Sequence, residues 1–367
     1  MHRLFLVTGL ALATTSTSEP PARPLKPLPL RVDTQFAHIS AAHEIPDGRV
    51  LISNAKGPTL LLLDPVTGSV TPVGAAGGGA DRYASPGGLY AGSGGTTLLL
   101  DRAQARVFTI SRTGELTGSR SIARRGVTSS SDADVDQQRI DANGLAYFVD
   151  LHRPGESLGA KESTLVRFEA NAQKSESVAK LRRAEVHTVP AGDGLTLGRR
   201  VIGSPADGWG VAPDGRVAVV RADPYRVEWH APGGQVTRGP VIDYVPLPMT
   251  EADKKHFASN RRGGVSIGPV GGPPTDLSKL QLLFAPTKPP FEPDGVLVSP
   301  DSVVWVLRTA PIDASAVIYD VFDGTGRRAD RIELPGNARI VGFGQGVVYA
   351  RHVDEAGRCE LRKYGLK

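Results

Sequence analysis

One short pattern returns six times along this chain of 367 residues: a run of strand-forming residues that ends at a polar or charged residue. The runs are Arg49–Asn54, Thr96–Asp101, Leu145–Asp150, Arg216–Arg221, Ser302–Arg308 and Gly346–Arg351. Self-similarity on this scale is the signature of repeat architectures, in which neighbouring repeats bury a shared core. The pattern therefore predicts a ring or stack of similar small sheets.

Turn-forming residues precede the runs, and further apolar stretches follow them. Pro46-Asp47-Gly48 and Pro213-Asp214-Gly215 are expected to form hairpin turns, because Asp-Gly pairs tolerate the positive φ that a tight turn requires. Most units then show a second turn and a fourth strand, as in residues 65–68 and 69–73. Four antiparallel strands in a radially repeated unit are typical of a β-propeller blade.

Two stretches carry a family resemblance. Residues 210–220 (GVAPDGRVAVV) and 293–306 (PDGVLVSPDSVVWV) resemble the inner strands of six-bladed propellers of the NHL and TolB-like kind. The resemblance covers nearly all of the chain after Asp33 and implies an all-β, six-bladed β-propeller with four-stranded antiparallel blades. It specifies no activity, because many unrelated functions share this fold.

The last repeat ends at Lys367 after its third strand, so it lacks a fourth. Residues 27–33 (PLPLRVD) are available to supply it. We expect Leu28–Val32 to pair with Cys359–Tyr364, which would close the ring and cover two open edges. One helix is expected, at Met249–Arg261 with Thr250 as its N-cap, inside an insertion at residues 245–291.

The N-terminus has the pattern of an export signal. A basic start, the apolar stretch Leu4–Leu12 and Ala11-Leu12-Ala13 predict a signal peptide and cleavage region over residues 1–18, hence an extracytoplasmic protein. The apolar stretch is shorter than the roughly 20 residues that span a bilayer, so no stable membrane insertion is expected. Residues 19–27 are expected to form a proline-rich linker that does not pack, and residues 28–367 one domain.

Composition excludes two classes of structure and partner. Cys359 is the only cysteine, so no intramolecular disulfide can form. The formal charge of +5 arises from 43 basic and 38 acidic residues that are dispersed along the sequence. Nucleic acid is not an expected partner, since no basic patch with interleaved aromatic residues appears.

The candidate site follows from the repeat spacing. The surplus sequence falls at 124–134, 151–163, 182–207 and 245–291, and all four segments are expected on one face, where repeat proteins usually bind. The residues that end the runs should open onto that face around the channel. The predicted channel-mouth residues are Asn54, Asp101, Asp150, His152, Asp207, Arg221, Tyr225, Asp294, Arg308, Arg351 and His352.

Two interpretations of this mouth remain open. Arg221, Arg308 and Arg351 would form a cationic half-ring, and arginine is suited to bidentate binding of a carboxylate. Alternatively, these polar residues only hydrogen-bond neighbouring blades. The first interpretation predicts an exported binding or scaffold module, without a cofactor, for a peptide, an anionic small molecule or an envelope protein.

A second function is a calcium-dependent hydrolase of the lactonase or esterase type. Six-bladed lactonases hold a metal in the channel, and oxygen ligands suit a hard cation. The residues of the right type here are Glu44, Asn54, Asn143 and Asp150. The pattern assigns no catalytic residue, and no zinc or nucleotide-phosphate motif is present.

Overall fold

A computed structural model describes residues 21–54, 59–123, 138–150, 160–190, 196–259 and 282–367. Regular structure in these ranges is almost entirely β-strand, with one α-helix, α1 (Glu251–Ser259), and one 3-10 turn at Ser93–Gly95. The prediction of a mostly β fold is therefore confirmed.

Each of the six sequence runs forms the second strand of an antiparallel unit whose strands follow one another in sequence order. All units but the last contain four strands. They are β3 (Ile39–Glu44), β4 (Val50–Asn54), β5 (Thr59–Leu63) and β6 (Val70–Pro72); β9 (Pro86–Ala91), β10 (Thr97–Asp101), β11 (Arg106–Ile110) and β12 (Leu116–Ser121); β13 (Arg139–Ile140), β14 (Ala146–Asp150), β15 (Glu162–Glu169) and β16 (Lys174–Arg182); β19 (Gly208–Val211), β20 (Val217–Ala222), β21 (Tyr225–His230) and β22 (Val236–Arg238); β24 (Phe291–Val298), β25 (Val304–Arg308), β26 (Ala316–Phe322) and β27 (Arg328–Pro335); and β28 (Ala338–Gly344), β29 (Val347–Val353) and β30 (Cys359–Gly365).

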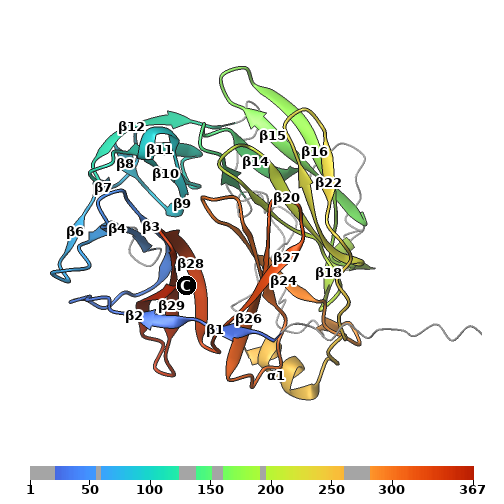
Figure 1. The fold of residues 1–367 in the computed structure, drawn as a ribbon. Coiled ribbons are helices and arrows are strands. Elements are labelled where there is room, and N and C mark those ends of the chain that lie inside the picture. Colours follow the sequence, from blue (N-terminus) through green and yellow to red (C-terminus); the bar gives the residue numbers. More distant parts are fainter. Residues whose placement is uncertain (1–20, 55–58, 124–137, 151–159, 191–195, 260–281) are drawn as a thin grey trace, which may run out of the picture.

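The units lie side by side around a common centre (Figure 1). Every first strand contributes to the lining of a cavity there. Small antiparallel sheets in this arrangement give a fold of the β-propeller type. The second strands are buried because neighbouring units cover both faces, as at Val50, Leu51 and Ile52, which are fully buried. This explains why the runs are continuously apolar and do not alternate.

The two Pro-Asp-Gly turns have the same structure in different units. Gly48 and Gly215 adopt φ values of 88° and 82°, in the left-handed region that favours glycine. In each turn the aspartate accepts the backbone N–H of the arginine two residues later, Asp47 from Arg49 at 3.1 Å and Asp214 from Arg216 at 3.0 Å. The repeat in sequence is therefore a repeat in turn geometry.

The first strands approach one another closely at glycines. A Cβ on Gly342 would lie 1.7 Å from the carbonyl oxygen of Ala42, because β28 and β3 pair in parallel at Gly342–Ala42 and Phe343–His43. A Cβ on Gly210 would lie 2.6 Å from the side chain of Val298 in β24. Glycine here permits the inner strands to converge.

The N-terminal segment pairs with the end of the chain. Strand β2 (Lys26–Leu28) is antiparallel to β30, with Leu28 opposite Lys363, so the predicted contact is found but is made mainly by residues that precede Leu28. An isolated bridge also joins Phe36 to Cys359. In Figure 1, β2 lies along the edge of the unit that contains β29.

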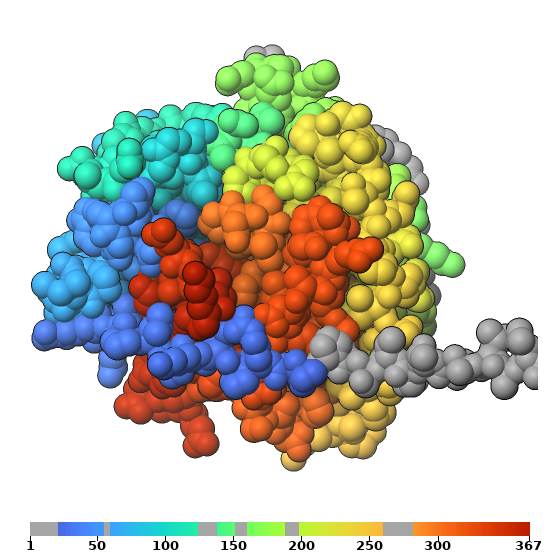
Figure 2. All heavy atoms as spheres, viewed as in Figure 1, coloured from blue at the N-terminus to red at the C-terminus, as the bar shows by residue number. Residues whose placement is uncertain are grey.

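The expectation that residues 19–27 do not pack is wrong for its described part. Strand β1 (Arg23–Pro24) pairs in parallel with β27, and Leu25 is buried in the core beneath it. Proline is tolerated because β1 and β2 are edge strands. Figure 2 shows this segment lying across the surface of the C-terminal units. Residues 1–20, with the predicted signal peptide, are outside the described residues.

The two longest insertions form a sheet of their own. Strand β18 (Thr196–Ile202) pairs with β17 (Val186–Pro190) and, in parallel, with β23 (Leu283–Phe284), which joins residues 182–207 to residues 245–291. A last short pair joins β7 (Ala75–Ala76) to β8 (Arg82–Tyr83). Sequence periodicity did not indicate either sheet.

The predicted helix is confirmed as α1. The hydroxyl of Thr250 accepts the backbone N–H of Asp253 at 3.2 Å, and the Asp253 carboxylate accepts the backbone N–H of Thr250 at 2.9 Å. Lys288 donates to the same carboxylate at 2.7 Å and holds the helix against the last part of the insertion. No helix in the described ranges is long and apolar enough to cross a membrane.

Candidate functional site

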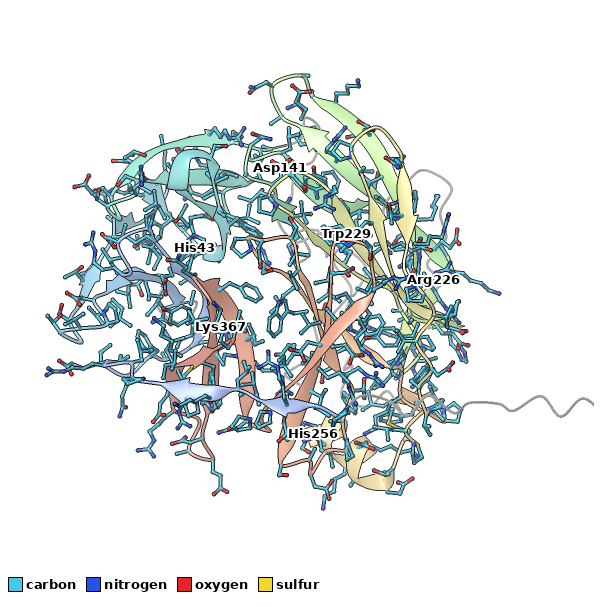
Figure 3. All side chains as sticks on the ribbon, in the orientation of Figure 1. His43, Asp141, Arg226, Trp229, His256 and Lys367 are labelled. Atoms are coloured by element: carbon cyan, nitrogen blue, oxygen red, sulfur yellow. The ribbon has the colours of Figure 1, made fainter. Side chains whose placement is uncertain are left out.

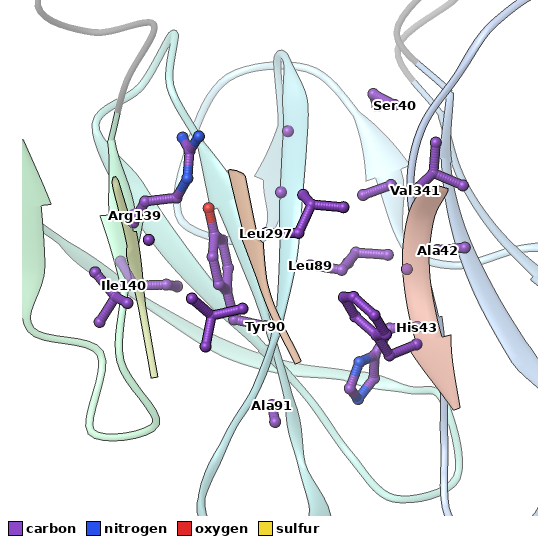
Figure 4. Close-up of a pocket in the computed structure, with 18 of the residues that line it drawn as sticks. Ser40, Ala42, His43, Leu89, Tyr90, Ala91, Arg139, Ile140, Leu297 and Val341 are labelled. Atoms are coloured by element: carbon purple, nitrogen blue, oxygen red, sulfur yellow. The ribbon is translucent and has the colours of Figure 1, made fainter. Parts of the chain in front are cut away.

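A cavity of about 340 Å³ lies along the inner strands. We call it the central cavity. Its walls come from β3, β9, β13, β19, β24 and β28. In Figure 4, Arg139 and Tyr90 stand on one side of this cavity, and Ala42, His43 and Val341 stand on the other. Leu89 and Leu297 add apolar surface between them.

The charged side chains of the central cavity are of one sign. Arg102 and Arg139 line it, and no aspartate or glutamate in the described part of the chain does so. Arg139 donates to the carbonyl of Gln138 at 3.1 Å and lies 5.5 Å from the ring centroid of Trp209. Arg139 forms no ion pair with a described carboxylate. The central cavity is therefore cationic.

His43 adds a neutral polar group at the far end of this cavity. Burial lowers the pKa of its imidazole to about 4, with Glu44 acting in the opposite direction. At neutral pH the ring offers one donor and one acceptor. It forms no side-chain hydrogen bond with the described residues, so both nitrogens are available to a ligand.

The predicted mouth arginine Arg221 is neutralised inside its own unit. It donates to Asp207 at 2.8 Å and to Glu228 at 2.9 Å. Although burial acts to raise it, the pKa of the Glu228 carboxyl lies below its usual range because Arg221, Arg226 and Arg238 stabilise the anion. Figure 3 places Arg226 on the far side of the view from His43. Arg221 is thus part of a structural charge network.

Arg308 has a similar environment in the next unit. It donates to Asp320 at 2.9 Å, and Asp320 is fully buried. Arg328 and Arg331 lie 3.6 Å and 3.4 Å from the same carboxylate, which also accepts the Tyr225 hydroxyl at 2.8 Å. The guanidinium of Arg308 lies 5.3 Å from the centroid of the Tyr225 ring. Two predicted site residues, Arg308 and Tyr225, therefore lie close together. Both bind the buried Asp320 carboxylate, which gives them a structural role.

Asp101 also has a structural role, because its carboxylate is used in hydrogen bonds within its own unit. Its carboxylate is fully buried and accepts the backbone N–H groups of Ala84, Ser85 and Gln104 at 2.5, 3.1 and 3.1 Å. The Gln104 side chain donates to it as well, at 3.1 Å. These bonds fix the loop that precedes β9.

The remaining predicted residues lie apart from the central cavity. Arg351 donates to the Ile39 carbonyl and to His38, both at 3.1 Å. Asn54 and Asp150 end β4 and β14, and Asp294 is exposed within β24. None of the predicted channel-mouth residues in the described ranges lines the central cavity, and His152 is outside those ranges. Their role in binding stays a prediction.

His352 is a buried residue of the core. It is 2% exposed, with one ring nitrogen 2.8 Å from the Tyr364 hydroxyl and the other 3.2 Å from the Asn337 side-chain oxygen. Burial first, and then the Arg362 charge, lower the pKa of His352 to about 4. The ring is therefore neutral in the folded protein above that pH.

A pH-dependent loss of stability follows from His352. The unfolded chain binds a proton near pH 6.5, whereas folded His352 does not until about pH 4, so the free energy of unfolding falls as pH decreases through this window. We expect His352→Gln to flatten the dependence by as much as about 1 kcal/mol per pH unit. Urea unfolding at pH 7, 6, 5 and 4.5 measures both slopes, and parallel curves would contradict the assignment.

The four residues of the calcium alternative do not converge. Ile39 pairs with Asn54 and Glu44 with Val50, so Glu44 and Asn54 occupy opposite ends of one hairpin, roughly 15 Å apart along the strand. Asn143 lies in a turn, and Asp150 at the far end of the strand that follows. In the described part of the chain no group of three or more His, Cys, Asp or Glu side chains is placed to hold a metal ion. These residues do not fit calcium.

The residues that line the central cavity are not among those predicted from the sequence. Arg139 lies in a strand of two residues, too short to show a period, and Arg102 directly follows the polar residue that ends a run. The available signal was register. In each unit the first strand comes directly before the hairpin turn, and first strands line the central cavity. The residues just before the turns at 46–48, 141–144 and 299–301 could therefore have been chosen as candidates.

Comparisons with known proteins show only distant likeness, which carries no argument about this chain. No protein-family model matches the chain. A search of curated proteins finds no match either. Among solved structures, the chain is similar to a DUF4221-family member from Bacteroides vulgatus, with 8% identity, 95% and 97% of the two chains covered and a TM-score of 0.49. It is also similar to a gluconolactonase from Xanthomonas campestris, with 12% identity, 95% and 99% covered and a TM-score of 0.44. A third is virginiamycin B lyase from Staphylococcus aureus, with 12% identity, 94% and 100% covered and a TM-score of 0.41.

Proposed function

We propose that this chain is an exported six-bladed β-propeller of the NHL and TolB-like kind that binds a small anionic molecule in its central cavity. The observation that carries the proposal is the charge of the cavity wall: Arg102 and Arg139 line it, and no described carboxylate does. The ligand is a carboxylate or phosphate on a small apolar body, since Leu89, Leu297 and Val341 supply the rest of the wall.

Strand pairing supports the blade count and the closure. First strands from six antiparallel units share one cavity, which fits six blades about one axis. The β2–β30 pairing supplies the last unit with a fourth strand, as ring closure requires. The proposed extracytoplasmic location rests on the sequence of residues 1–18.

The central cavity replaces the mouth half-ring as the anion site. Arg221 and Arg308 already bind buried carboxylates, so an incoming anion would have to compete with Asp207, Glu228 and Asp320. Arg139 has no such competitor among the described residues. Within a cavity, a guanidinium acts on an anion through a lower dielectric than that of bulk water, which strengthens the attraction.

Benzoate is a suitable probe because it combines one carboxylate with a small apolar ring. We expect the mature protein to bind benzoate and to bind the neutral isostere benzamide more weakly. Arg139→Gln should weaken benzoate binding about tenfold, since a hydrogen bond to a charged group contributes about 1.5 kcal/mol or more. Titration calorimetry at low salt measures all of these affinities.

Arg112→Gln is the matched control. Arg112 is exposed and lines neither the central cavity nor another described pocket, yet its loss changes the net charge by the same amount. Its affinity for benzoate should stay within about twofold of the wild type, because an exposed charge acts through the high dielectric of water, which weakens its attraction for an anion. Equal losses in both variants, or equal affinity for benzoate and benzamide, would refute the anion site.

The hydrolase alternative has no specific support in the geometry. Its four ligand candidates are dispersed, and the cationic wall of the cavity repels a divalent cation. Binding of a peptide or an envelope protein at the channel-mouth face stays a prediction from sequence.

A further inference from the structure

A second cavity, of about 630 Å³, lies at the turn end of the units. We call it the turn-side cavity. Hairpin turns that join first to second strands form its wall, at residues 45–46, 92–96, 299–301 and 344–346. Arg23, in strand β1, and Leu366, which follows β30, complete it.

The two cavities meet at a pair of inner-strand residues. His43 and Phe343 line both cavities and are direct partners in the parallel β3–β28 ladder. The cavities therefore lie end to end, with these two side chains at the junction. Each cavity has its own set of charged residues beyond this junction.

The turn-side cavity has the opposite charge to the central cavity. Glu44, Asp301 and Asp330 line it, against one cation, Arg23. Arg23 binds Asp330 at 2.7 Å, and Lys363 lies 3.5 Å from Glu44. The one partner of the Asp301 carboxylate among the described residues is the neutral hydroxyl of Ser299. Asp301 is therefore the carboxylate that no described cation neutralises.

Aromatic surface lies in the same cavity. The Phe343 ring packs against Trp305 with centroids 5.7 Å apart, and both residues line the cavity. Ile45, Val303 and Val347 extend this apolar surface. Aromatic rings pack favourably against another ring in an offset or edge-to-face arrangement. An apolar wall beside a carboxylate matches a ligand with both kinds of group.

We propose that the turn-side cavity binds an organic amine with an apolar body, with the ammonium group at Asp301 and the apolar body against Phe343. This site is separate from the anion site, and it does not rest on the proposed function. Its ligand carries the opposite charge because the two walls carry opposite charges.

Benzylamine is the probe, with benzyl alcohol as the neutral isostere. Titration calorimetry on the full mature chain should show saturable binding of benzylamine and weaker binding of benzyl alcohol. Asp301→Asn should weaken benzylamine binding about fivefold and leave benzyl alcohol unchanged, as expected for a partly exposed ion pair. No saturable binding of benzylamine would overturn the proposal.

Three further variants locate the site. Asp47→Asn removes a carboxylate from a turn at the same end that does not line the cavity, so it should have little effect. Phe343→Leu keeps apolar volume but removes the aromatic face, and should weaken benzylamine and benzyl alcohol alike, because both probes place the same ring against Phe343. Arg139→Gln should leave benzylamine binding unchanged. A loss of amine affinity in Asp47→Asn equal to that in Asp301→Asn, or a change caused by Arg139→Gln, would place the amine elsewhere and overturn the proposal.

The two proposals fail in different ways. If benzoate binding is absent but benzylamine binding depends on Asp301, the proposed function is wrong and the amine site stands. If benzoate binding depends on Arg139 and benzylamine does not bind, the amine site is wrong and the proposed function stands.

Discussion

Asp320→Asn is expected to lower the free energy of unfolding by about 3 to 5 kcal/mol, the cost typical of removing one partner from a buried ion pair. Asp320 is fully buried, and three arginines lie within 3.6 Å of its oxygens. Without the negative charge, Arg308, Arg328 and Arg331 would repel one another in a site from which water is largely excluded.

The same substitution also weakens a link between units. The Tyr225 hydroxyl, on β21, donates to Asp320 on β26, and the Tyr225 ring packs against Phe322 with centroids 6.0 Å apart. We therefore expect the two units that contain β21 and β26 to unfold together in the variant. Unfolding should stay cooperative, with its midpoint at a lower urea concentration. Urea unfolding followed by circular dichroism measures the midpoint and the slope.

Glu360→Gln is the control for this experiment. Glu360 accepts Arg362 at 2.9 Å on an exposed part of β30, where both side chains are at least half exposed. Exposed pairs contribute about 0 to 1 kcal/mol, so this variant should unfold almost as the wild type does. If Asp320→Asn is no less stable than Glu360→Gln, the buried cluster does not have the structural role assigned to it.

The charge networks at Asp320 and Glu228 explain why the mouth half-ring was a reasonable but incomplete prediction. The polar ends of the runs were visible in the sequence; Arg308 ends its second strand, and Arg221 is the last residue but one of its own. Two of their partners, Glu228 of Arg221 and Asp320 of Arg308, are on the third strands β21 and β26, at sequence distances of 7 and 12 residues. Only the strand register decides which third-strand residue faces a given arginine.

Local signals predicted the repeated part of the fold well. Apolar runs, Pro-Asp-Gly turns and the Thr250 cap each act within a few residues, and all three have the expected structure. Long-range pairing of short segments was harder. Strands β1 and β13 have two residues each, and no periodicity exists over so short a length. Arg139, on which the proposed function depends, lies in one of them.

Gly342→Ala is the second substitution with a large expected effect, a loss of about 3 kcal/mol of stability, at the upper end of the range for overpacking. The new Cβ would lie 1.7 Å from the Ala42 carbonyl oxygen and 2.5 Å from its carbonyl carbon, so backbone must move. Because Phe343 and His43 follow directly in the same ladder, both cavities should change shape. Weaker binding of both benzoate and benzylamine is expected.

Gly118→Ala is the matched control for Gly342→Ala. Gly118 also lies in a strand, β12, but a Cβ there would meet no atom within 4 Å. Since alanine restricts the unfolded chain more than glycine does, this variant should be as stable as the wild type or up to about 1 kcal/mol more stable. Urea unfolding of both variants measures the difference in stability. Equal stability would mean that β28 and β3 do not approach as closely as the inner-strand pairing requires. The junction between the two cavities would then need a different description.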